Sequence, residues 1–525
     1  MATHPTYLEN HWGDQRQGRS LSHLADKLPP MIWKSSSTPT SSETIHNLLR
    51  TLKLTGPVLE YGTRKTTHRT IFSGQRKKLR DDLQQLNSDV TRESALAFGK
   101  ALWEQWTALD HDTDMGWLIW GAGFFGDDHM TLAMYRFMCD QLKQGKAGYR
   151  IADCTLGALM SIDTPMARMT LASYASSTRY NSLTRRAKDY IEGCAREEGL
   201  SVDELEDQCI PDFGLDVHGT RHFSYGSRSF QVTVGENFYP VVRDEDGKNT
   251  KNLPRMRKSD DVEMVEQAKQ EWDLLKGSLI HTFKIQFRRL EKMMLTRRTW
   301  HFEAWKRHMC DHRVMYLFAK NLLWRMDVGG EKICFRVAED RSFASVDDEP
   351  LELPSHGLVE LVHPLHLSAR ERERWGELFL DYELVSPVEQ LGRQIHPRGD
   401  EEAFLRALYE DVELEPKWVR ISNKMMEFNL GSVNNYSVQP RRHFFKEIVP
   451  GSGVELHLHL TPGLHPKDYR QDEPQRVESV RFTYTGEQRA KMGCRDAKHE
   501  ALTDLVWNEA IHTLSKLLTH TTNQG

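Results

Sequence analysis

The stretch SFQVTVGENFYPVVRDEDGK, residues 229–248, is where the hydrophobic pattern of this sequence changes its period. Apolar Phe230, Val232 and Val234 alternate with polar residues, the pattern of a strand with one buried face. A turn at 235–237 follows, and the apolar residues resume over 239–243, so the stretch predicts a β-hairpin. This hairpin separates a helical first half of the chain from a second half that contains strands.

Upstream of the hairpin, the pattern is a series of short helices joined by short turns. Residues 95–109 and 130–142 carry apolar side chains at helical spacing, and further helices are expected over 151–160, 166–174 and 183–195. Each helix is too short to be stable alone, whereas stacked pairs would bury a continuous ridge. The sequence therefore predicts a HEAT-like helical repeat region over 43–200; an irregular helical bundle is the alternative.

The ends of this helical region are marked by composition. Residues 35–42 read SSSTPTSS, which predicts that 1–42 is an N-terminal segment with a flexible linker. A capping box at Ser201 and Glu204 opens a short helix just after the repeat region. We expect residues 201–327 to hold the hairpin and long basic helices, over 261–295 and 301–326.

The last 198 residues, 328–525, mix both periods and predict an α+β domain. Ser368 and Glu371 form a second capping box, which should open a helix ending near Leu380. Strands are expected over 332–337, 358–362, 417–421, 454–460 and 478–484, and a closing helix over 502–518. The predicted fold class is thus mixed α and β, with HEAT-like helical repeats followed by a β-hairpin, long helices and a C-terminal α+β domain.

Composition places the chain among soluble globular proteins. The 525 residues are 38% hydrophobic and 28% charged, with a formal net charge of −5, so bulk charge favours no particular partner. The seven cysteines form no C-x-x-C pair, as in reduced cytosolic proteins. The longest nearly apolar run, 115–125, is too short to cross a bilayer. We expect a cytoplasmic protein without a membrane partner.

The sequence GAGFFG at 121–126 matches the glycine spacing of a dinucleotide-binding loop. Such a loop needs a preceding strand and open backbone amides, but here the context is helical and Phe124 and Phe125 are bulky. Asp127 and Asp128 follow, where they would repel a phosphate. A turn between repeat helices is the favoured interpretation.

His457 and His459 alternate with leucines, which places both imidazoles on one face of a strand. Such a pair can bind zinc or iron if further ligands converge, and His443 and His465 are nearby candidates. No complete ligand set is evident, so a solvated polar face is favoured, and no metal or other cofactor is expected.

The run 361–397 contains the best candidates for catalysis, His363, Asp381 and Arg393. A histidine with carboxylates could act in acid/base chemistry. Alternatively, His363 ends a strand and Arg393 forms a bidentate ion pair with Asp381 or Glu383. No nucleophile accompanies these residues, so the structural role is favoured.

Residues 276–325 are strongly basic, with 12 Lys or Arg against three acidic residues, an excess of +9. Lys284, Arg288 and Lys292 are spaced as one stripe of a helix, and Arg297 and Arg298 follow. Such a stripe could contact the phosphates of a nucleic acid, with Trp300 and Trp305 stacking on bases. The alternative is that this basic stretch packs against the acidic stretch 339–360.

Three runs of this sequence resemble the MolR-like family of bacterial proteins: residues 361–397, 199–216 (GLSVDELEDQCIPDFGLD) and 239–261 (YPVVRDEDGKNTKNLPRMRKSDD). The resemblance extends from about Leu28 to the final helix. It implies a regulator, since the family name refers to molybdate metabolism. Some members carry more helical repeats and a nucleic-acid-binding WGR module, which we do not find in these residues. The resemblance implies no catalytic residue.

The sequence therefore predicts a non-catalytic binding or scaffold protein with a regulatory role in a bacterial cell. A protein partner is expected first and a nucleic acid second. The alternative is an enzyme whose site lies in the 361–397 run.

Overall fold

The computed structural model describes residues 18–55, 73–176, 181–235, 237–244, 247–396, 398–425, 428–430, 440–465, 473–492 and 496–518. The chain divides into two compact units. Unit 1 comprises residues 1–176, 180–211 and 270–278, and unit 2 comprises 177–179, 212–269 and 279–525. The four regions expected from the sequence do not coincide with these units, because the helix at 202–208 groups with unit 1 and everything from 279 onward forms one unit.

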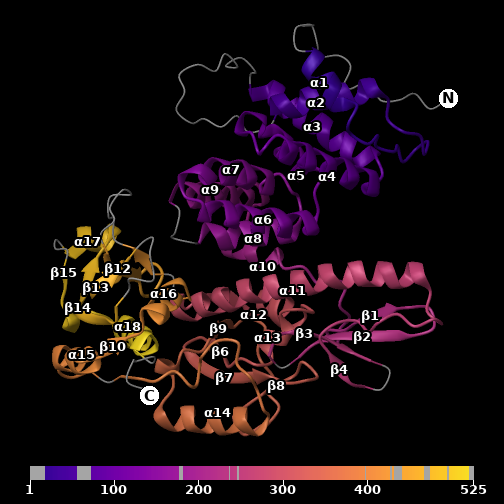
Figure 1. Ribbon diagram of the computed structural model, residues 1–525. Coiled ribbons are helices and arrows are strands. Elements are labelled where there is room, and N and C mark those ends of the chain that lie inside the picture. The colour runs from indigo at the N-terminus through magenta and orange to yellow at the C-terminus, as the bar shows by residue number, and fades with distance from the viewer. Residues whose placement is uncertain are drawn as a thin grey trace. The chain divides into compact units, whose positions relative to one another are not determined.

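Unit 1 is helical (Figure 1). Successive helices pack against each other as pairs, α4 on α5, α6 on α7 and α8 on α9. Its helices are α1 (Gly18–Ala25), α2 (Ser42–Thr55), α3 (Ser73–Asp89), α4 (Arg92–Ala108), α5 (Trp117–Phe124), α6 (Asp128–Lys143), α7 (Lys146–Leu159), α8 (Pro165–Ala175), α9 (Asn181–Glu198) and α10 (Val202–Gln208), with a short 3-10 turn, η2 (Thr113–Met115).

The GAGFFG match lies within α5 and at its end, so it is not a phosphate-binding loop. Helix α5 is buried along most of its length, and a Cβ on Gly123 would collide with the carbonyl oxygen of Ala158 on α7. Asp127 caps α6 by accepting the N–H of Met130 at 2.9 Å. The glycines therefore serve close helix packing.

Residues 35–42 do not form the expected linker. Met31 and Thr40 are joined by two hydrogen bonds, of 2.7 Å between backbones and 3.0 Å to the Thr40 hydroxyl. Isolated bridges also join Ile32 to Pro39 and Trp33 to Val90. The polar residues thus form a tight loop, because Thr and Ser side chains satisfy its backbone donors.

The described residues of unit 2 form three antiparallel sheets, ordered β1-β2-β3-β4, β5-β9-β6-β7-β8 and β10-β14-β13-β12-β11, with β15 pairing β14. The hairpin predicted at 229–248 is present as β2 and β3, in a four-stranded sheet. The strands are β1 (Arg221–Ser224), β2 (Ser229–Val234), β3 (Pro240–Arg243), β4 (Asn249–Thr250), β5 (Thr299–His301), β6 (Trp324–Val328), β7 (Glu331–Val337), β8 (Phe343–Ala344), β9 (Leu358–Leu361), β10 (Glu413–Leu414), β11 (Asn429–Leu430), β12 (Arg441–Glu447), β13 (Val454–Leu464), β14 (Gln475–Tyr484) and β15 (Asp496–Ala497).

Helix α11 (Val262–Thr296) is the predicted long helix, and its residues 270–278 group with unit 1. The second long helix, expected over 301–326, is absent: this segment holds α12 (Phe302–Trp305), a π turn η3 (Lys306–Cys310), α13 (Tyr316–Ala319) and the start of β6. The reason is its aromatic content, since Trp305 packs on Trp324 with ring centroids 5.1 Å apart and bends the chain around a core.

The remaining helices of unit 2 follow the capping signals. Both predicted capping boxes are present, at Ser201 for α10 and at Ser368 for α14 (Ala369–Asp381). Residues 417–421, expected as a strand, lie in helix α16 (Pro416–Met425). The others are η4 (Pro364–His366), α15 (Glu401–Tyr409), α17 (Gly486–Met492), η6 (His499–Ala501) and α18 (Asp504–Leu518). None of the helices in the described residues is both long enough and apolar enough to span a lipid bilayer.

Candidate functional site

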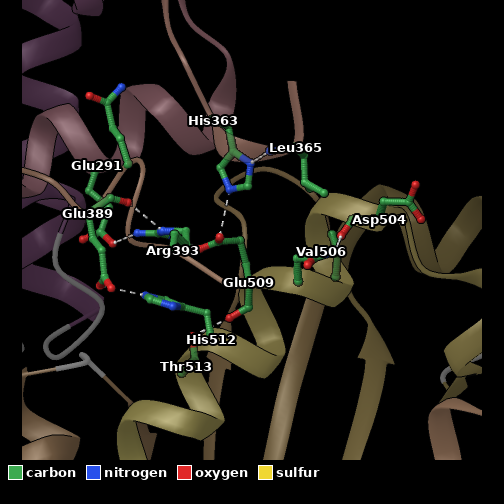
Figure 2. A network of polar contacts seen from close by, with 12 residues as sticks. Glu291, His363, Leu365, Glu389, Arg393, Asp504, Val506, Glu509, His512 and Thr513 are labelled. Carbon is green, nitrogen blue, oxygen red and sulfur yellow. Dashed lines mark hydrogen bonds and ion pairs between the residues drawn. The ribbon is translucent and has the colours of Figure 1, made fainter. Parts of the chain in front are cut away.

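The two ends of the 361–397 run meet the last helix of the chain in a buried polar cluster (Figure 2). His363 lies two residues after the end of β9 and caps η4, because its Nδ1 accepts the N–H of Leu365 at 3.2 Å. Arg393 lies in the loop after α14, and Glu509 lies on α18. We call His363, Arg393 and Glu509 the buried ion cluster.

Each polar atom of the His363 ring has one defined partner. Because Nδ1 accepts a backbone N–H, the ring proton resides on Nε2, which donates to Glu509 Oε1 at 3.0 Å. The carboxylate of Glu509 thus fixes the orientation of the imidazole, as carboxylates do for histidines in many proteins.

The guanidinium of Arg393 uses all three of its nitrogens. Nη1 donates to Glu509 Oε2, Nη2 donates to Glu291 Oε1 at 2.8 Å, and Nε donates to the backbone oxygen of Glu389 at 3.0 Å. Glu291 belongs to α11, so Arg393 links its own loop to two helices. The side chain of Glu291 is 46% exposed and forms the solvent-facing end of the network.

Burial and charge act in opposite directions on Glu509. Burial alone would raise the pKa of its carboxyl, but the hydrogen bond from His363 and the charge of Arg393 prevail and hold the pKa at about 2. Burial likewise works to lower the pKa of Arg393, and Glu509 and Glu291 outweigh it and raise that pKa. Both groups are therefore charged at neutral pH, and His363 is 1% exposed between them.

His512, one turn beyond Glu509 on α18, lies beside this cluster. Burial and the charge of Arg393 lower its pKa to about 4, so the imidazole is neutral at pH 7. Its Nε2 lies 3.5 Å from Glu389 and has no hydrogen-bond partner among the described residues. Glu389 instead accepts from Lys516 at 2.9 Å, and although burial opposes it, this contact lowers the pKa of Glu389.

The structure brings together two of the three candidate catalytic residues. His363 and Arg393 converge, but Asp381 is exposed at the end of α14. Arg393 pairs with Glu509 and Glu291, and not with Asp381 or Glu383 as expected from the sequence. The three members of the cluster are at most 3% exposed, and His363 and Arg393 both bond to Glu509, so in this arrangement none of them is accessible to a substrate.

Glu509, the central carboxylate, carries no signal in the sequence that marks it as buried. On a helical wheel it falls opposite the apolar stripe of Trp507, Ile511 and Leu514, where a solvent-exposed residue is expected. Helix α18 is buried on nearly all sides from Val506 to Leu514, so this position is also inside. No local pattern indicates that, because its partners lie 116 and 146 residues earlier in the chain.

The two candidate metal ligands lie on β13, on the same face as predicted, but His457 is 7% exposed and the face is not simply solvated. His457 hydrogen bonds to His443 at 2.8 Å and to Thr483 at 2.8 Å. The ring of His443 is nearly parallel to those of His457 and His459, at 16° and 19°. Within the described residues, no group of three or more His, Cys, Asp or Glu side chains has an arrangement suited to a metal.

The candidate nucleic-acid contacts differ in exposure. Lys284 and Arg288 are exposed on α11, and Lys292 is half-buried. Arg297 lies 3.7 Å from Glu360, and the guanidinium of Arg298 lies over the Trp300 ring at 4.6 Å. The exposed part of the predicted stripe is therefore Lys284 and Arg288.

The aromatic residues of this basic stretch are buried, and the acidic stretch 339–360 contacts it only in part. Trp300 and Trp305 are 5% and 0% exposed, so they are not placed to stack on bases. The packing alternative holds at Glu360, which pairs with Arg325 and lies 3.7 Å from Arg297, both in the basic stretch 276–325. Asp347 and Asp348 pair instead with Arg374 and Arg336, outside that stretch.

Comparison with known proteins places this chain beside others without a described activity. A family model described as a domain of unknown function, DUF4132, matches residues 247–419. The uncharacterized protein YehI of Escherichia coli (strain K12) is 27% identical over 369 residues, which are 70% of this chain and 29% of that protein. The chain thus matches less than a third of the length of this relative. No solved structure matches.

Proposed function

We propose that this chain is a non-catalytic binding protein with a regulatory role in the bacterial cytoplasm, akin to the MolR-like proteins. The observation that carries the proposal is a contrast within unit 2. The catalytic candidates His363 and Arg393 are buried and bonded within the buried ion cluster, whereas Lys284 and Arg288 are exposed on a long helix. The charged side chains that a partner can reach are therefore suited to binding.

Unit 1 supports a binding role through its architecture. Consecutive helices pack pairwise. We propose that these pairs act as HEAT-like repeats, which present extended surfaces to proteins. In this proposal unit 1 takes a protein partner, and the α11 face takes a second, anionic partner such as a nucleic acid.

A capture experiment from the native host tests the binding role. The full chain is used as bait, and bound proteins and nucleic acids are identified separately. We expect recovery of at least one stoichiometric partner. If no partner is recovered and the purified chain turns over a small substrate, the proposal is contradicted.

A quantitative assay tests the α11 face. Binding of labelled DNA and RNA is measured by anisotropy between about 50 and 200 mM salt, and affinity should fall steeply because phosphate contacts release counterions. The Lys284→Glu, Arg288→Glu double variant should bind about tenfold or more weakly to all sequences alike, since backbone contacts carry no sequence information. Lys417→Glu, Lys498→Glu makes the same charge change at two other exposed lysines and should bind normally.

The second candidate is an enzyme acting at the 361–397 run. The convergence of His363 and Arg393 on one carboxylate favours it. It is the weaker candidate because these groups are buried and mutually satisfied. It would be supported if His363→Gln abolished turnover of a substrate while the folded chain kept its thermal stability.

A further inference from the structure

The C-terminal end of α14 exposes three large apolar side chains within six residues. Leu380 is 79% exposed, Val385 is 48% exposed and Tyr382 is 41% exposed. The opposite side of the helix is ordinary core, where Trp375 and Phe379 pack in a cluster with Leu323 and Val362. Single exposed leucines are common, but three large exposed apolar side chains within six residues make this segment a candidate for an interaction surface.

Tyr382 is held rigidly in this surface. Its hydroxyl donates to Asp348, and the guanidinium of Arg336 lies over its ring at 4.1 Å. An aromatic side chain that is already fixed loses little conformational freedom on binding, which is the property of a binding hot spot.

Carboxylates surround these apolar residues. Glu377, Asp381 and Glu383 are exposed, and none forms an ion pair with any residue that the structure describes. Glu377 and Asp381 repel each other at i, i+4 and lie at the unfavourable end of the helix dipole. Glu383 has φ 51°, at the position after the cap where glycine is usual. These charges do not stabilise the helix, and they are exposed to a positive partner.

A surface of the opposite sign lies elsewhere in unit 2. Arg255, Met256, Arg257 and Lys258 are all exposed, Met256 by 48%. The segment 248–258 contains five Lys or Arg and no acidic residue. Like the α14 end, this segment combines an exposed apolar side chain with neighbouring charged side chains, but here the charges are positive.

This basic run is presented on a rigid base. Arg228 forms a buried fork with Asp260, of 3.1 Å and 2.6 Å, and also donates to the backbone oxygen of Arg255 at 3.0 Å. Tyr225 donates to the backbone oxygen of Pro254 at 3.1 Å. Hydrogen bonds from Arg228 and Tyr225 thus hold the backbone that carries these charged side chains.

We propose that the α14 end of one copy of this chain binds the 255–258 run of a second copy. Leu380 and Tyr382 would pack on Met256, while Glu377 and Asp381 would meet Arg255 and Lys258. Both surfaces lie inside the segment 247–419 that matches the family model. A nucleic acid would bind the basic run but not the acidic α14 end. A second copy of this chain would bind at both surfaces.

The contact joins two different patches, so a bound pair leaves one patch of each kind unused, one on each copy. Such a head-to-tail contact repeats into a ring or an open chain of subunits. Its strength depends on charge, so added salt should weaken it.

The test is the mass of the full chain in solution, measured by analytical ultracentrifugation over a range of concentrations. We expect association at about 50 mM salt and monomers at about 500 mM. Glu377→Lys, Asp381→Lys and, separately, Arg255→Glu, Lys258→Glu should each weaken association about tenfold or more. Combining all four changes in one chain should restore it, and so should an equal mixture of the two double variants.

Two further variants make the outcome decisive. Leu380→Ala removes an exposed side chain without changing charge, so it should fold normally and still weaken association. Lys284→Glu, Arg288→Glu, which tests the proposed function, should leave association unchanged. A wild-type chain that stays monomeric throughout would overturn the inference. So would charge-reversed chains that still associate like wild type, or that lose association and do not regain it when the changes are combined.

Discussion

Glu509 is a buried charge whose partners make it stabilising. Removing one member of a buried ion network costs about 3 to 5 kcal/mol, because the others lose their compensation. Arg393 would keep only Glu291, whose side chain is half exposed, as its ionic partner. We therefore expect Glu509→Gln to lower the free energy of unfolding by about 3 kcal/mol at pH 7.

The pH dependence has a definite sign. The pKa of Glu509 is about 2 in the folded chain, below its ordinary value, so its stabilisation is complete above about pH 4.5 and is lost as the pH falls towards 2. The stability difference between wild type and Glu509→Gln should shrink over that range, as measured by denaturant unfolding. Glu413→Gln breaks an exposed pair with Arg476 and should have little effect at any pH. Equal stability of wild type and Glu509→Gln at pH 7 would contradict the cluster's role.

Gly123 allows α5 to pack closely against the backbone of α7. Gly123→Ala would push a methyl group into the carbonyl of Ala158, so helices α5 and α7 must separate. Gly121→Ala meets only the ends of Leu52 and Leu102, at 3.0 and 3.1 Å, which can rotate away. We expect a loss of about 3 kcal/mol for Gly123→Ala and about 1 kcal/mol or less for Gly121→Ala, by thermal or chemical unfolding. Similar losses for both would show that α5 and α7 do not pack this closely.

Elements that depend on neighbours in sequence were predictable. The capping boxes at Ser201 and Ser368 need only four residues, and both helices begin where expected. The strand prediction at 417–421 failed because five residues are too few to distinguish a period of 2 from one of 3.6. Trp418 there donates to the backbone of Leu517 at 2.8 Å, a contact that no local pattern can indicate.

At the scale of the whole molecule, the order of helices before sheets was predictable from the change of period near 229. The division into units was not, because it depends on which distant residues pack together. The same holds for the site: His363 and Arg393 were recognisable from residue type, but Glu509 and Glu291 come from α18 and α11, on either side of the 361–397 run.

Helix α11 contributes to both units, so breaking it should affect both. Lys269 is exposed at the point where assignment changes from unit 2 to unit 1. Lys269→Pro removes a helical hydrogen bond and should cost about 3 kcal/mol or more. Hydrogen exchange should accelerate in α6 and in the β2–β3 hairpin alike, while Lys269→Ala should leave both protected. A change confined to one unit would show that α11 does not couple them.

This shared helix also constrains how the gene can be divided. Nine residues in the middle of α11 complete unit 1, although 58 residues of unit 2, 212–269, precede them in the chain. No single breakpoint therefore releases two whole units: a fragment ending at Pro211 lacks Trp272 and Leu275, which are both buried. Gene fission, or fusion of one half to another protein, would leave an incomplete core, so the two units should be inherited together.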